Sequence, residues 1–71
     1  MTTHRESLSP EYRTLVETAN LDWQVQEYIR CVDHQHEHSG FQIKAAAIAE
    51  IAVEQHGSAF DDAVHRYRPD A

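Results

Sequence analysis

The chain has 71 residues, and a domain of this size buries only about 60% of the surface that its unfolded form exposes, which disfavours the deep cleft of an enzyme. Twelve acidic against six basic residues give a formal net charge of −6, which disfavours nucleic acid or an anionic membrane as the main partner. The sequence has no apolar run of membrane-spanning or signal-peptide length and only one cysteine, Cys31, so it predicts a soluble, cytoplasmic protein without an internal disulfide.

The chain is expected to begin with an arm and a short helix. Residues 1–8 show no apolar period and are predicted to form a loose, flexible N-terminal arm. Ser9 before Pro10 is typical of a helix start, and a helix is predicted over residues 10–19. Its apolar stripe consists of Tyr12, Leu15, Val16 and Ala19.

A second, longer helix is predicted over residues 21–38. Its apolar stripe consists of Leu21, Val25, Tyr28, Ile29 and Val32. If the first helix simply continued, this stripe would lie on the side opposite the first one, so we expect a break at residues 20–22, where Asn20 or Asp22 can cap a helix. One long helix that is buried on both sides is the alternative.

The third helix is predicted over residues 41–56. Ser39 and Gln42 have the spacing of a capping box, and Gly40 is expected to close the preceding helix with a positive φ. The segment is apolar around most of its circumference, so we expect it to be the central and most buried helix.

The fourth helix is predicted over residues 59–68, between a Ser58 cap that follows Gly57 and a stop at Pro69. Four short helices without a strand signal predict an all-α fold, a compact bundle that forms a single helical domain over residues 9–71. We expect the core to contain Leu15, Val16, Val25, Ile29, Val32, Phe41, Ile48, Ile51, Ala52, Phe60 and Val64.

Cys31, His34 and His38 would share one helical face if the second helix reached His38, because they are spaced at i, i+3 and i+7. Thiolate and imidazole bind transition metals, so this face is a candidate zinc site of a metal-responsive module. The alternative is that Cys31 fills a small space at the edge of the core and that the histidines cap helix ends. That capping role would apply to His36, His38, His56 and His65. No catalytic residue and no other cofactor is predicted.

The third and fourth helices meet at a tight turn, as the two helices of a helix-turn-helix do. Arg66 and Arg68 would then be the candidate contacts of a dimeric, DNA-binding transcriptional regulator. Asp61 and Asp62 in the first turn of the fourth helix would repel phosphate, so DNA binding is the alternative hypothesis.

Elimination favours a protein-protein interaction module, which acts as an adaptor, accessory subunit or inhibitor and whose acidic surface suits a basic partner. Trp23 either bridges the first two helices or is exposed as an anchor for the partner. The candidate partner-binding residues are Trp23, Glu27, Arg30, His34 and Glu37. Apolar residues outside the main stripe of the third helix also indicate a homodimer, in which a second copy covers Ile43, Ala46, Ala47 and Val53.

Overall fold

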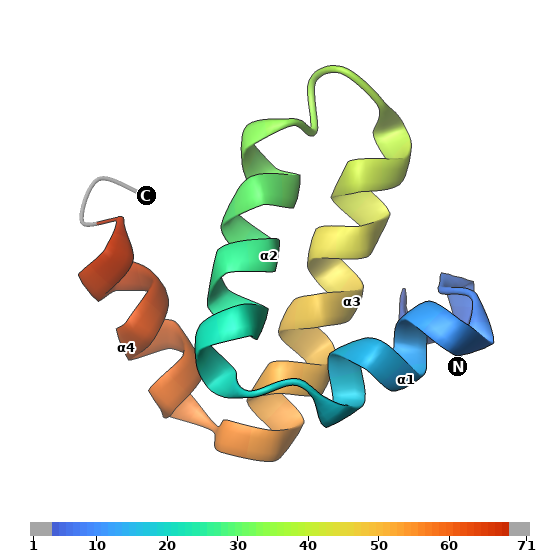
Figure 1. The fold of residues 1–71 in the computed structure, drawn as a ribbon. Helices are drawn as coiled ribbons and strands as arrows, with labels where there is room; N and C mark the ends of the chain where they lie inside the picture. The colour runs from blue at the N-terminus through green and yellow to red at the C-terminus, as the bar shows by residue number, and fades with distance from the viewer. Residues whose placement is uncertain (1–3, 69–71) are drawn as a thin grey trace.

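A computed structural model of the chain describes residues 4–68, which form four α-helices and a short 3₁₀ turn without any strand (Figure 1). The turn, η1, spans His4–Ser7 and is followed by α1 (Pro10–Thr18), α2 (Leu21–Asp33), α3 (Ser39–His56) and α4 (Ser58–Tyr67). The predicted all-α bundle of four short helices with a short N-terminal arm is therefore confirmed. The first three residues of that arm and the stop expected at Pro69 lie outside the described residues.

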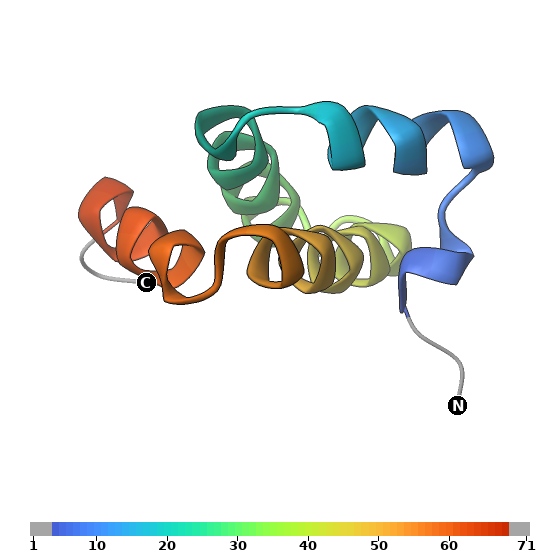
Figure 2. The ribbon, with the colours of Figure 1, turned by 90° about the horizontal axis from the view of Figure 1, so that it is seen from below.

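The antiparallel pair of α2 and α3 forms the centre of the fold, and a turn at residues 34–38 joins the two helices (Figure 1). α4 packs against both members of this pair. Seen from below, α1 lies in one layer and α3, followed by α4, lies in another (Figure 2). The arm and α1 both contact α3, which is consequently the helix that contacts every other element.

Side-chain caps separate α1 from α2 in the way that the sequence predicts. The Ser9 hydroxyl accepts the backbone N–H of Tyr12 at the start of α1, where Pro10 is the first helical residue. The Asn20 side chain accepts the backbone N–H of Trp23 at 2.8 Å and so begins α2. A single long helix is thereby excluded, because Ala19 and Asn20 have extended backbone conformations.

The prediction that α2 continues to His38 is wrong, since the helix ends at Asp33. His34 is its C-cap, and its backbone N–H donates to the carbonyl of Arg30. His38 has extended dihedral angles, and its Nδ1 accepts the N–H of Gly40 at 2.9 Å, which makes His38 the N-cap of α3. The helical spacing of apolar residues stops at Val32. The polar residues that follow therefore give no signal that the helix continues.

The two glycines have different roles from those expected. Gly40 lies inside the first turn of α3, so it does not close α2 with a positive φ, and Ser39 is helical instead of being the cap. Gly57, with a φ of 62°, is the only positive-φ residue among residues 4–68. It ends α3 and is also the N-cap position of α4, which leaves Ser58 as the first helical residue without a capping hydrogen bond.

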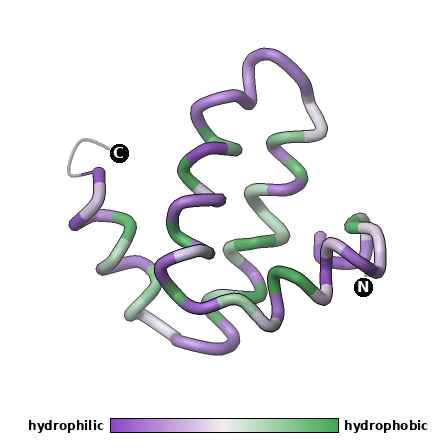
Figure 3. The backbone as a smooth tube through the Cα atoms, in the orientation of Figure 1, coloured by the Kyte–Doolittle hydropathy of each residue, from purple (hydrophilic) through white to green (hydrophobic). Residues whose placement is uncertain are grey.

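Two clusters of buried side chains hold the helices together, and hydrophobic positions recur along α2 and α3 with a hydrophilic turn between them (Figure 3). The first cluster contains Leu8, Val16, Cys31, Ala45, Ala47, Ile48 and Ile51. The second contains Val25, Ile29, Ala52, Phe60 and Val64. Val32 and Phe41, both predicted to be core residues, are half-buried and pack against the first cluster.

Leu15 is the one predicted core residue that the structure leaves in solvent, with 50% of its surface exposed. α1 is short, and it contributes one fully buried residue, Val16, with Tyr12 packed partly beside it. Leu15 is one helical step, about 100°, from Val16, so it lies at the edge of the contact with the bundle. The amphipathic stripe of α1 is therefore narrower than the sequence pattern suggests.

A buried glutamine joins three helices at the base of the bundle. Gln24 is fully buried, and its Nε2 donates to the carbonyl of Val16 and to Oε1 of Gln55, both at 2.9 Å. The Gln55 amide donates in turn to the carbonyl of Glu17 at 2.7 Å. These bonds tie the last turn of α1 to α2 and α3, where the final carbonyl groups of a helix otherwise lack partners.

The N-terminal arm is docked on α3 in this structure. Leu8 is buried in the first cluster, and the backbone N–H of His4 donates to the Glu50 carboxylate at 2.9 Å. The His4 imidazole also contacts Glu50, and Arg5 forms ion pairs with Glu50 and Glu54. A segment this short cannot show a helical spacing of apolar residues, so its sequence could not indicate that the arm docks on α3.

Acidification is expected to release the arm from α3. The His4 backbone N–H is the main cause of a lowered pKa at Glu50, with smaller effects from the His4 and Arg5 side chains. The ionised carboxylate therefore stabilises the docked arm fully above the ordinary pKa of about 4.5, and this stabilisation is lost as the pH falls through the lowered pKa. The protection factors of the amides in residues 4–8, which are corrected for the intrinsic pH dependence of exchange, should fall in that range, and they should fall less in Glu50→Gln, which lacks this carboxylate. An equal response in both proteins would contradict this role of Glu50.

Candidate functional site

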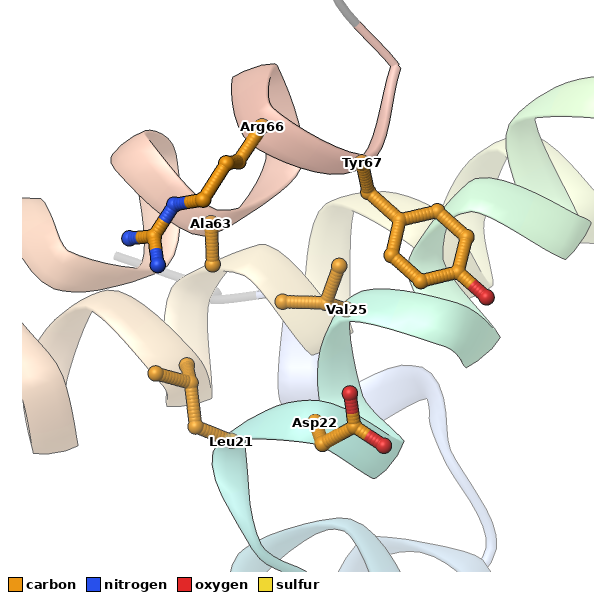
Figure 4. Close-up of a pocket in the computed structure, with 6 residues that line it drawn as sticks. All are labelled: Leu21, Asp22, Val25, Ala63, Arg66 and Tyr67. Atoms are coloured by element: carbon orange, nitrogen blue, oxygen red, sulfur yellow. The ribbon is translucent and has the colours of Figure 1, made fainter.

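An open groove with a volume of about 370 Å³ lies between the start of α2 and the end of α4 (Figure 4). Its apolar floor consists of Leu21 and Val25 from α2 and Ala63 from α4. Arg66 and Tyr67 extend from α4 toward opposite ends of the groove, and Asp22 of α2 lies near Tyr67 (Figure 4). The groove thus combines a hydrophobic base with one cation, one anion and one phenol at its edges.

The polar groups around this groove are available to a ligand. Tyr67 is 55% exposed, the largest exposed fraction among the large hydrophobic residues described. The Arg66 guanidinium is exposed and makes no ion pair or hydrogen bond within residues 4–68. Asp22 accepts a hydrogen bond from Gln26 at 2.7 Å and has a second oxygen free to accept another. A partner could therefore contact both charges without first breaking a buried ion pair.

The proposed partner-binding residues on α2 are largely engaged within the domain. Trp23 is half-buried and packs against the first cluster. The Glu27 side chain is only 13% exposed, and its carboxylate accepts hydrogen bonds from the Tyr12 hydroxyl at 3.1 Å and from Arg30 at 2.6 Å. Burial, followed by the charge of Glu27, raises the pKa of Tyr12 far above its ordinary value. Glu27 consequently stabilises the contact between α1 and α2 through its hydrogen bond with Tyr12.

The remaining residues of that predicted face are exposed but lie apart from a groove. Arg30 pairs with Glu27, and His34 contacts Glu37 in the turn after α2. Both His34 and Glu37 are exposed in that turn, so they form a local pair at its surface. A docking surface on this side would have to use polar side chains without an apolar floor.

The three candidate metal ligands do not share a helical face, because α2 ends before His34. Cys31 is fully buried in the first cluster, and this burial raises the pKa of its thiol. Nδ1 of His38 accepts the N–H of Gly40 as the cap of α3. Among residues 4–68, no group of three or more histidine, cysteine or acidic side chains is arranged to hold a metal ion.

The two candidate DNA-binding arginines have different surroundings. Arg68 donates to the Asp33 carboxylate at 2.5 Å and so links the end of α4 to the end of α2, whereas Arg66 lines the groove. α3, Gly57 and α4 do form a helical corner, but Asp61 and Asp62 are exposed in the first turn of α4. The turn that would enter a major groove therefore presents negative charge toward phosphate.

The groove itself was not anticipated from the sequence. The sequence places Arg66 near the end of the fourth predicted helix. Its position above Leu21 and Val25, however, depends on the packing of α4 against α2. The sequence pattern assigns Tyr67 to the apolar stripe of the fourth helix together with Phe60 and Val64, whereas the structure leaves Tyr67 55% exposed.

Comparison of this chain with protein-family models, with curated proteins and with solved structures found no match in any of the three. None of the helices in residues 4–68 is both long enough and apolar enough to cross a membrane.

Proposed function

We propose that this protein is a protein-protein interaction module that binds its partner in the groove between α2 and α4. The observation that carries the proposal is the exposed pair of Arg66 and Tyr67 at the edge of an apolar floor. Arginine and tyrosine are enriched at the energetic centres of protein interfaces, where they combine a large contact area with hydrogen bonding. In this role the chain would act as an adaptor, accessory subunit or inhibitor.

The chemistry of the groove and of the surrounding surface defines the kind of partner. We expect an apolar side chain of the partner to contact Leu21, Val25 and Ala63, with a basic group near Asp22 and an acceptor near Arg66. The net charge of −6 favours a partner that is basic overall, because complementary charge accelerates association and disfavours acidic competitors.

Truncating the exposed side chain of Tyr67 at the edge of the groove should weaken partner binding strongly. The partner is captured with the wild-type chain from its host, identified and purified, and its dissociation constant is then measured for Tyr67→Ala and Arg66→Ala. We expect Tyr67→Ala to raise that constant about 30-fold, because an anchor residue at an interface contributes about 2 kcal/mol or more. Both variants should keep the stability of the wild type, since both side chains are exposed.

A matched control uses Leu15→Ala, which removes a 50% exposed apolar side chain from α1, away from the groove. Its dissociation constant should equal that of the wild type. Equal affinities for Tyr67→Ala and the wild type would contradict the groove as the docking site. Tight, sequence-specific binding of duplex DNA, lost in Arg66→Ala, would favour the DNA-binding alternative instead, which the exposed Asp61 and Asp62 argue against.

A further inference from the structure

The outward side of α3 carries an apolar stripe that the N-terminal arm covers only in part. Ile43, Ala46, Glu50 and Val53 recur at helical spacing on this side of α3. The arm contacts the stripe at Glu50, while Ile43 and Val53 on either side of that residue remain 44% and 50% exposed. We call this stripe, together with Glu54, the outer face of α3. It extends in both directions beyond the contact with Glu50.

The docked arm shows which chemistry the outer face accepts. Arg5 binds Glu50 and Glu54, one turn apart on α3, through its guanidinium. Leu8, three residues after Arg5, is buried in the cluster that also contains Ala45, Ala47 and Ile48. The small alanine side chains leave room for a leucine to approach the helix. Arg5 is therefore a contact that the arm makes with the outer face itself, whereas Leu8 is anchored in the interior of the fold beside this face.

The contacts of the arm are of a kind that a competing segment can replace. η1 is a single turn of four residues, none of which is buried. Within the described part of the arm, only Leu8, directly after η1, has a buried side chain. The Glu54 side chain is 63% exposed, and ion pairs exposed to solvent contribute little to stability. A longer helix could repeat the contacts of Arg5 and also cover Ile43 and Val53, which the arm leaves in solvent.

We propose that the outer face of α3 is a second docking site, for a basic amphipathic helix of another protein, and that the N-terminal arm occupies this site in cis. The incoming helix would place basic residues against Glu50 and Glu54 and apolar residues against Ile43, Ala46 and Val53. The arm then acts as an intramolecular competitor: the apparent affinity for the helix equals the intrinsic affinity multiplied by the fraction of molecules in which the arm is released. This site is separate from the groove between α2 and α4.

The test measures binding of a labelled helical peptide to the full-length chain. The probe is a peptide of about 14 residues with leucines along one side and arginines beside them, a length that allows three to four helical turns. In Arg5→Glu, the arm carries a negative charge toward Glu50 and Glu54 and should detach. We expect this variant to bind the probe about tenfold more tightly than the wild type at low ionic strength, because the competitor has been removed.

Three further measurements make the result specific. Arg13→Glu changes the net charge equally on α1, outside the contacts of the arm with Glu50 and Glu54, and should match the wild type. Adding Glu50→Gln and Glu54→Gln to Arg5→Glu should remove the gain, because the face then lacks the carboxylates that attract the basic probe, and glutamine forms no new ion pair with the glutamate at position 5. A probe with glutamates in place of its arginines should not bind to either protein.

Equal affinity of the probe for the wild type and Arg5→Glu would overturn the proposal: if amide exchange shows the arm to be released, the arm does not compete, and if the arm stays docked, Arg5 does not hold it. Tighter binding that persists when Glu50→Gln and Glu54→Gln are added would also overturn it, since the charge of the outer face would then be irrelevant. Neither outcome depends on Tyr67 or Arg66, so a failure here is distinguishable from a failure of the proposed groove.

Discussion

Replacing Ile48 by alanine is expected to lower the free energy of unfolding by about 2 to 5 kcal/mol, the usual cost of truncating a buried isoleucine. Ile48 is fully buried at the centre of α3, in the cluster that joins Val16 of α1, Cys31 of α2 and Leu8 of the arm. A domain of this size has a total stability of only about 5 to 10 kcal/mol, so the loss would be a large part of it. Urea unfolding followed by far-ultraviolet circular dichroism measures the change.

Ile43→Ala provides the matched control for this prediction. It makes the same truncation on the same helix, but at a side chain that is 44% exposed. Its effect on the free energy of unfolding should be clearly smaller, because less apolar surface is lost from the interior and no enclosed cavity is created. Equal effects at Ile43 and Ile48 would show that the centre of the fold has been assigned to the wrong side of α3.

Gln24→Glu is expected to cost about 3 to 5 kcal/mol at neutral pH, because it places an unpaired carboxylate in the interior. The Gln24 side chain is fully buried and donates two hydrogen bonds, to the Val16 carbonyl and to Gln55. A carboxylate cannot donate either bond and would repel the Val16 carbonyl oxygen. Chemical unfolding at pH 7 measures the loss, with Gln42→Glu on the exposed first turn of α3 as the control.

The pH dependence of this variant identifies the cause of its loss. Burial would raise the pKa of the introduced carboxyl in the folded state, so the variant should be least destabilised below the ordinary glutamate pKa of about 4.5 and increasingly destabilised as the pH rises. The difference in stability between Gln24→Glu and the wild type should therefore shrink toward pH 4. A constant difference over this range would mean that altered packing, and not buried charge, is responsible.

The two proposed docking sites use different parts of the bundle. The groove depends on exposed residues of α4, whereas the outer face of α3 depends on the state of the N-terminal arm. If both are used, the first would be available at all times and the second only in molecules whose arm is released. The variants Tyr67→Ala and Arg5→Glu separate them, because each changes only one of the two sites.

The sequence alone determined the helical class and the starts of α1 and α2, because these depend on neighbouring residues. Ser9 with Pro10 and the Asn20 cap act within a single turn, and both begin helices where the pattern predicts them. The apolar stripe of α4 likewise identified Phe60 and Val64 as core residues. The end of α2 was missed because Asp33 to His38 contain no apolar residue whose spacing could separate helix from turn.

Only the tertiary structure decided which residues of each stripe are covered and which distant side chains meet. Leu15 has the spacing of a core residue but lies beside the contact of α1, while the polar Gln24 is buried because two helices supply its acceptors. Leu8 and Arg5 have no periodic signal, yet the acidic and small residues of α3 hold them in place. The groove joins Leu21 and Val25 to Arg66 and Tyr67 from the other end of the chain. Local patterns cannot specify such contacts, because they depend on how helices distant in sequence pack against one another.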